Sequence, residues 1–151
     1  MTKVELVGFK ELEKGLERLS KAVGKGVLRR GLKKASQPIA ELANEIAPKG
    51  ATGEFSKSFS YSTRLNKRQG RLHRKMFRGD RASVEGFVGT NDPAGVQQEF
   101  GNQNHDPQPS LRPAWDAEAL PTLDRLGKDL WSELDKSIIR ANRKAAKLAG
   151  G

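Results

Sequence analysis

Residues 58–65 read Ser-Phe-Ser-Tyr-Ser-Thr-Arg-Leu, and this stretch decides the fold class because Phe59, Tyr61, Thr63 and Leu65 alternate with Ser58, Ser60, Ser62 and Arg64. Phe59, Tyr61 and Leu65 fall on one side of the alternation. A period of two is typical of a half-buried β-strand. A second alternating run covers residues 82–90; its alternate positions are Ala82, Val84, Gly86, Val88 and Thr90. We therefore expect an antiparallel β-hairpin or a small sheet at the centre of the chain.

The two predicted strands are joined by residues 64–81, a strongly basic segment with one acid, Asp80. Its eight cations are Arg64, Lys67, Arg68, Arg71, Arg74, Lys75, Arg78 and Arg81. We expect a long hairpin loop, and loops of this size are usually functional or disordered. Three environments fit it: DNA phosphates, whose affinity would fall in salt, an acidic neighbouring subunit, or solvent alone. Only Phe77 lies within it, so the stacking of single-stranded bases is not indicated.

Helical periodicity flanks the predicted hairpin on both sides. Apolar residues spaced three and four apart predict a helix over residues 9–23, interrupted at Gly24 and Gly26. A second stripe predicts a helix over 27–46, ending before Pro48, with a kink or register break at Pro38. Residues 94–100 are expected to form a short helix or an irregular segment. Residues 102–113 should be an extended loop, and 114–146 a long helix. The expected fold class is α+β, in one domain over residues 1–151.

The apolar stripes of these helices are predicted to converge on one face of the hairpin. The residues expected to be most buried are Leu16, Leu32, Leu42, Phe59, Val88, Leu126 and Leu130. Beyond Ile139 the stripe fades, so residues 140–151 are expected to form a basic, flexible tail. This tail and the basic loop should point away from the packed body, because burying so many cations carries a large desolvation cost.

Composition narrows the function classes. The chain has 151 residues and is 35% hydrophobic, which predicts a thin core completed by association with neighbours. The absence of cysteine excludes disulfides and thiolate metal sites. No apolar run has the length of a membrane span or a signal peptide, so we expect a protein of a cytoplasm. The basic loop and the tail carry +7 and +4 of the net charge of +10, leaving a nearly neutral body.

Residues suited to catalysis do not occur in recognisable patterns. His73 and His105 fall in different predicted loops, and a metal site needs three or more convergent donors. The serines of the first strand lack a glycine elbow or a partner histidine. The carboxylates alternate with Lys and Arg on helix faces, as in surface ion pairs. We expect no enzyme activity, no metal and no cofactor.

Three local patterns, in this order, resemble the tail-completion (neck) family of long-tailed bacteriophages, the lambdoid type in particular. The first is Val-Gly-Phe-Lys-Glu-Leu at 7–12, followed by two helices and Ala47-Pro48. The second is Thr-Gly-Glu-Phe-Ser-Lys-Ser at 52–58, and the third is Gln-Glu-Phe-Gly at 98–101 with Leu-Arg-Pro-Ala-Trp at 111–115. The residues that carry the motifs are Pro48, Thr52, Gly53, Ser58, Glu99, Phe100, Gly101, Arg112, Pro113 and Ala114.

The resemblance implies a structural virion protein that forms a ring at the head-proximal end of the tail and joins tail to head. Six copies are expected, with twelve as the alternative, alongside neighbouring neck and tail-tube proteins and non-specific contact with passing DNA. The protein would be located in the virion, and in the host cytoplasm during assembly. Within the motifs, Gly53 is suited to a positive φ angle, Phe100 to burial, and Glu99 to pairing with Arg112. A different class remains open, a small basic nucleic-acid-binding protein.

Overall fold

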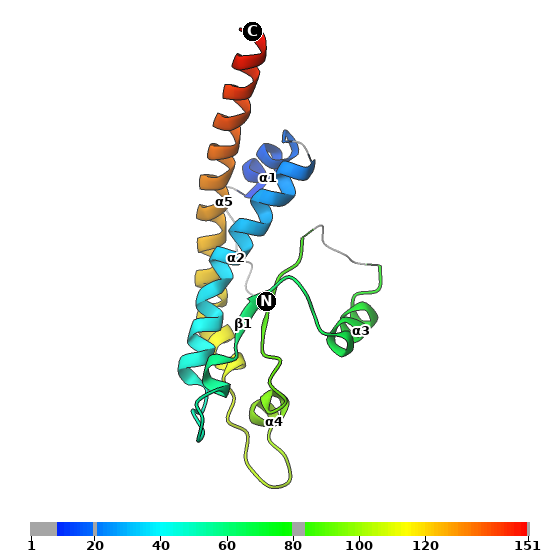
Figure 1. Cartoon of the computed structure of the whole chain (residues 1–151), viewed down its shortest axis with the longest axis vertical. Coiled ribbons are helices and arrows are strands. Elements are labelled where there is room, and N and C mark those ends of the chain that lie inside the picture. The colour runs from blue at the N-terminus through cyan, green and yellow to red at the C-terminus, as the bar shows by residue number, and fades with distance from the viewer. Residues whose placement is uncertain (1–8, 20, 80–83, 151) are drawn as a thin grey trace.

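Two long antiparallel helices form the axis of the molecule (Figure 1): α2 over Lys21–Ile46 and α5 over Leu111–Ala149. The computed structural model describes residues 9–19, 21–79 and 84–150. A short helix, α1 over Phe9–Glu17, packs on this pair, and a two-stranded antiparallel sheet packs on α2. The predicted α+β class is confirmed. No helix in the described ranges is both long enough and apolar enough to cross a lipid bilayer.

Glycines allow the helices to approach α5 closely. A Cβ atom added at Gly31 of α2 would lie 2.6 Å from Cδ2 of Leu130, and one added at Gly15 of α1 would lie 2.6 Å from Cδ2 of Leu134. Real Cβ atoms do not come this close to another carbon, so a larger residue would force the helices apart or the leucines out of place. Leu130 and Leu134 are 3% and 1% exposed and fill the space that the glycines leave.

Ion pairs run along the outside of the α2–α5 contact. Arg30 donates to Glu133 at 2.9 Å, and Lys34 lies 3.3 Å from Asp129. The hydrogen bond from Arg30 lowers the pKa of the Glu133 carboxyl below its usual value. These pairs are partly exposed, and such pairs contribute little to stability. They fix the register of the two helices more than they strengthen the contact.

The sheet is shorter than its sequence pattern. Strand β1 covers Ser60–Ser62 and strand β2 covers Phe87–Gly89, with Tyr61 opposite Val88. The side chain of Asn44 on α2 holds the start of the hairpin: its amide donates to the carbonyl of Phe59 at 3.0 Å, and its oxygen accepts from the Phe59 N–H at 2.9 Å. Phe59 is therefore buried against α2, and the antiparallel pairing is confirmed over only three residues of each predicted strand.

The buried residues form two clusters rather than one core. The first joins the C-terminal half of α2 to the hairpin and to the start of α5; it consists of Ile39, Ala43, Ala47, Phe59 and Ala114. The second joins α1, the first half of α2 and the later part of α5; it consists of Leu12, Val27, Leu130 and Leu134. The prediction that all stripes converge on the hairpin is therefore wrong. Phe59 and Leu130 are buried as predicted, whereas Leu16, Leu32, Leu42, Val88 and Leu126 are only partly buried.

Several predicted boundaries are also corrected. The first helix ends at Glu17 instead of running to Val23, and Gly24 and Gly26 lie inside α2. Helix α2 continues through Pro38, although proline removes one backbone hydrogen bond. Helix α5 begins at Leu111, so Pro113 lies in its first turn, where the proline nitrogen needs no backbone acceptor. The predicted flexible tail is helical through residue 149 and continues α5.

The segment between the strands is not a simple loop. It contains α3 over Lys67–Met76, so the prediction of a basic hairpin loop over 64–81 is wrong in its secondary structure. A single 3-10 turn, η1 over Phe55–Lys57, precedes β1. A short helix, α4 over Gly95–Phe100, follows β2 and confirms the predicted helix in 94–100. Figure 1 shows α3 standing apart from the two long helices.

Candidate functional site

Helix α3 carries most of the predicted basic site, and local capping explains why it is helical. Asn66 is its N-cap: the Asn66 side chain accepts from the Gln69 N–H at 2.8 Å, and the Gln69 side chain accepts from the Asn66 N–H at 3.3 Å. This reciprocal capping box satisfies two donors that the first turn would otherwise leave free. Lysine and arginine are also good helix formers, so a run of cations favours a helix at this position.

One face of α3 is anchored through His73 to the start of β2, at the end of the hairpin nearest the connecting segment. The His73 ring meets the Phe87 ring of β2 edge-on, with centroids 5.2 Å apart, and lies 4.9 Å from the Phe77 ring. Its Nε2 atom is 3.8 Å from a carboxylate oxygen of Glu85. These contacts give α3 a defined inner side, occupied by His73 and Phe77.

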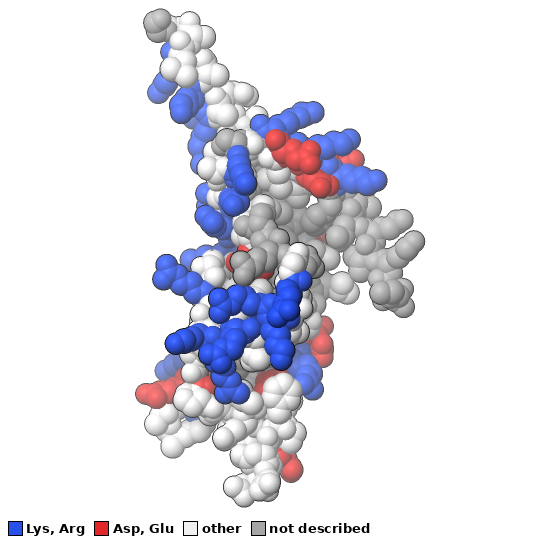
Figure 2. Space-filling model, turned by 90° about the vertical axis from the view of Figure 1, so that its right-hand side faces the viewer, with Lys and Arg blue, Asp and Glu red and all other residues white. Residues whose placement is uncertain are grey.

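The cations lie on the opposite side of α3. Successive helical residues are about 100° apart, so Lys67, Arg68, Arg71, Arg74 and Lys75 project within an arc of about 120°. Arg78 follows two residues after the end of the helix. All six are exposed. Figure 2 shows Lys and Arg side chains gathered at mid-height on the side of the molecule where α3 lies. Arg64 is exposed just before the helix, and the eighth predicted cation, Arg81, lies outside the described residues.

Two apolar side chains flank the cations. Leu72 is 53% exposed and Met76 is 76% exposed. They lie between the cationic arc and the anchored side of α3, where no core covers them. An exposed helix with five cations on one face and a histidine-anchored opposite face is suited to binding an extended anionic surface.

The motif residues at the end of the chain build the joint between α4 and α5. The Glu99 carboxylate accepts from the backbone N–H groups of Ser110 at 2.9 Å, Leu111 at 3.1 Å and Arg112 at 2.8 Å. Partial burial raises the pKa of Glu99, but these three donors and the charge of Arg112 outweigh it, and the pKa is lowered overall. Glu99 thereby caps α5, and the Ser110 hydroxyl makes no capping bond of its own.

This joint confirms one predicted link in modified form and corrects another. Glu99 does connect the short helix to the last helix, but through backbone N–H groups rather than through the Arg112 guanidinium. That guanidinium instead lies over the Phe100 ring, 5.4 Å from its centroid. Phe100 is 64% exposed, so its predicted burial is wrong. Gly101 has φ of +73°, and a Cβ there would lie 2.8 Å from Pro107, so both conformation and space call for glycine.

The remaining motif residues form the turn from α2 into β1. Pro48 follows the end of α2 and is partly buried, and Gly53 has φ of +69° as expected. The Thr52 hydroxyl accepts from the Glu54 N–H at 3.4 Å. The Ser58 hydroxyl donates to the Phe55 carbonyl and accepts from the Thr90 hydroxyl, both at 2.7 Å, which ties the two ends of the hairpin together.

The last two motif residues, Pro113 and Ala114, lie in the first turn of α5. Ala114 is fully buried in the first cluster, and Pro113 is partly buried beside it.

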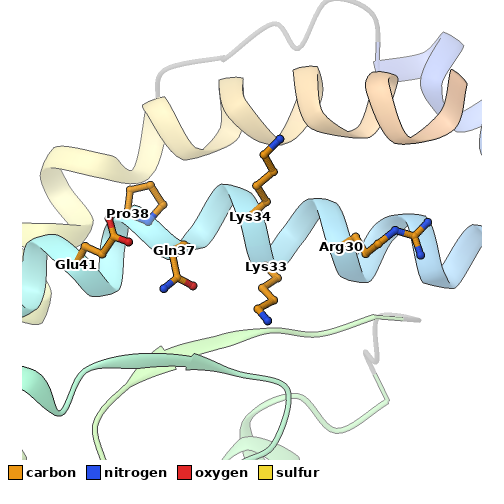
Figure 3. A pocket seen from close by; sticks show the side chains of 6 residues that line it. All are labelled: Arg30, Lys33, Lys34, Gln37, Pro38 and Glu41. Carbon is orange, nitrogen blue, oxygen red and sulfur yellow. The ribbon is translucent and has the colours of Figure 1, made fainter. Parts of the chain in front are cut away.

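A shallow hollow of about 480 Å³ lies on α2 (Figure 3), and its described lining residues are Arg30, Lys33, Lys34, Gln37, Pro38 and Glu41. Lys34 points toward α5, and Lys33 points toward the hairpin side. Arg30 and Lys34 are already paired with carboxylates of α5. In the described ranges no group of three or more His, Asp or Glu side chains comes close enough to hold a metal. The absence of enzyme activity stays a prediction.

Sequence reasoning missed three residues that position these sites. Asn44 clamps the hairpin to α2, His73 orients α3, and the buried Ser110 places the start of α5 beside Glu99. A partly buried asparagine inside a long helix was a usable signal, since asparagine is a poor helix former. The role of His73 depends on a contact with Phe87, fourteen positions away, so no local sequence pattern could predict this role.

Comparison with protein-family models, curated proteins and solved structures finds no match to this chain.

Proposed function

We propose that this protein is a non-enzymatic structural component of a tailed-phage neck that assembles as a ring at the head-proximal end of the tail. The observation that carries the proposal is the α4–α5 joint. Glu99, Gly101 and Arg112, drawn from the two separated halves of the third motif, meet in one compact unit around the start of α5. Residues of the motif thus have a shared structural task, which is the kind of role a scaffold family preserves.

Exposed apolar side chains support assembly with further copies. Val96, Phe100, Trp115 and Leu120 are each more than half exposed, around α4 and the first half of α5. Leu120, Trp131 and Ile138 also fall within about 20° of one another on α5, because positions 11 and 18 residues apart nearly coincide on a helix. A protein with two small core clusters and such a stripe gains stability when neighbours cover it.

The proposed ring contains six copies, with twelve as the alternative. Its further partners are the adjacent neck and tail-tube proteins, and its place is the virion after assembly in the host cytoplasm. No cofactor has a role in this function, since joining rings requires shape and surface rather than chemistry.

The test measures assembly and joining separately. The purified chain is expected to form a closed ring by mass photometry, and to restore tail joining in phage extracts that lack it. A Leu120→Ser/Ile138→Ser variant should keep its helical circular dichroism and lose the ring. The matched control, Leu72→Ser/Met76→Ser, replaces a similar pair of exposed apolar side chains on α3 and should keep the ring. A parent chain that stays monomeric and restores no joining would exclude the neck role.

The runner-up is a small basic nucleic-acid-binding protein, favoured by the cationic arc of α3. The two functions predict different behaviour of the purified chain, in its oligomeric state and in tail joining. A dedicated nucleic-acid-binding protein would act as a monomer and would not restore tail joining, whereas a neck subunit needs its ring for function.

A further inference from the structure

We propose that the cationic face of α3, formed by Lys67, Arg68, Arg71, Arg74 and Lys75 and followed by Arg78, binds the phosphate backbone of double-stranded DNA without sequence preference. The proposal rests on the neck function, because it identifies the DNA that passes through the neck as the partner of α3. The physical reasons for it are the geometry of α3 and the charges on it.

The cations are free to bind a partner. No ion pair or hydrogen bond in the described part of the chain engages the side chains of these six residues. The five acids that do form pairs with cations, or with His73, lie elsewhere: Glu85, Glu118, Asp124, Asp129 and Glu133. Six like charges on and just after one short helix repel each other, so an anionic partner would relieve a cost that the free protein carries.

The dimensions of α3 fit a duplex. A ten-residue helix is about 15 Å long. Duplex DNA carries about one charge per 1.7 Å of axis, so about nine phosphate charges lie along that length. Four of the six cations are arginines, which bind phosphate oxygens through two donors at once. The His73 ring on the inner side of α3 packs on Phe87, so the arc faces away from the hairpin.

Other anionic partners fit less well. Single-stranded nucleic acid is bound through stacked aromatics, and the cationic arc contains none. A membrane-surface helix needs a broad apolar face opposite its cations. In α3 the centre of that side is the polar His73, which packs on Phe87, and the exposed apolar side chains beside it are Leu72, Met76 and Phe77. An acidic protein surface would match the same charges, and duplex binding by the parent is the measurement that separates the two.

The test uses two variants with equal net charge. The first changes Arg68, Arg71, Arg74 and Lys75 to Gln, which keeps helix propensity high. The control changes Arg140, Arg143, Lys144 and Lys147 to Gln near the end of α5. Each variant lowers the net charge of +10 by four. Affinity is measured by fluorescence anisotropy on a 30-base-pair duplex of mixed sequence, the corresponding single strand and phosphatidylserine vesicles, between 50 and 300 mM salt.

We expect the parent to bind the duplex and to prefer it over the single strand. The α3 variant should bind about 100-fold more weakly at 0.1 M salt, and the slope of log affinity against log salt should fall by about 3 to 4, since each phosphate contact contributes about 0.9. The control should lose less than about fivefold and keep most of the slope.

Three results would overturn the proposal: no duplex binding by the parent at 50 mM salt, equal losses in both variants, or tighter binding to the vesicles or the single strand. Ring formation and tail joining are scored on the same preparations. If the α3 variant forms the ring and joins tails but does not bind DNA, the neck function is unaffected. If the parent binds DNA but does not join tails, the neck function is excluded and the DNA contact is retained.

Discussion

The Glu99 carboxylate accepts a hydrogen bond from the Arg112 N–H at 2.8 Å, which places an anion at the N-terminal end of a 39-residue helix. The positive end of a helix dipole favours a negative charge there. Two further N–H groups bond to the same carboxylate. One side chain thus links α4 to the first residues of α5.

Glu99→Ala should lower the free energy of unfolding by about 1–2 kcal/mol, the usual cost of losing a helix cap and leaving its donors without a partner. Urea unfolding followed by circular dichroism measures it. Glu45→Ala, an exposed acid late in α2, serves as the control and should change stability by less than about 0.5 kcal/mol. Equal effects of the two substitutions would show that the cap contributes nothing special.

The same carboxylate predicts a pH dependence. Because the Glu99 pKa is lowered in the folded protein, its stabilisation is fully present above the ordinary pKa of 4.5 and is lost as pH falls through the lower, folded-state pKa. The stability difference between the parent and Glu99→Gln should therefore be largest near neutral pH and shrink below about pH 4.5. Unfolding curves of both proteins at several pH values between 3 and 7 measure this difference. A constant difference over that range would contradict the assignment.

The contact of Gly31 with Leu130 predicts a coupled pair of substitutions. Leu130→Ala should cost about 2–5 kcal/mol because Leu130 is 3% exposed, whereas Leu120→Ala, at an exposed site, should cost little. Gly31→Ala should cost about 1 kcal/mol, because the clash with Leu130 exceeds the gain in helix propensity. In the Leu130→Ala background the same change should stabilise the protein. A double-mutant cycle on unfolding free energies measures the coupling, and additive effects would refute it.

His73 predicts how firmly α3 is held. His73→Ala removes two ring contacts worth about 0.5–1.5 kcal/mol each, so amide hydrogen exchange in α3 should become about tenfold faster while exchange in α2 is unchanged. His73→Phe keeps the rings and loses only the approach to Glu85, so it should retain most of the protection. Loss of protection in both variants would shift the anchoring role from ring packing to Glu85.

Local patterns in the sequence determined the class of most elements. Period-three and period-four stripes located α2 and α5, alternation located the hairpin, and glycine chemistry anticipated the positive φ of Gly53. These features depend on residues within one or two turns of each other, which is why they could be predicted. The same reasoning failed at α3, where high charge density and two glycines favoured a loop although Asn66 and Gln69 supplied a capping box.

Tertiary structure alone decided how the elements meet. No sequence pattern singles out Gly15 and Gly31, but the lack of space against Leu134 and Leu130 makes them contact residues. Phe100 reads as core, but the turn at Gly101 turns it outward beneath Arg112. The sequence by itself determined that this protein would carry eight cations between two strands. Helical spacing puts five of them on one face of α3. Only the packing of His73 on Phe87, between residues distant in sequence, decided that this face would be the exposed one, because a helix has no preferred side until something binds it.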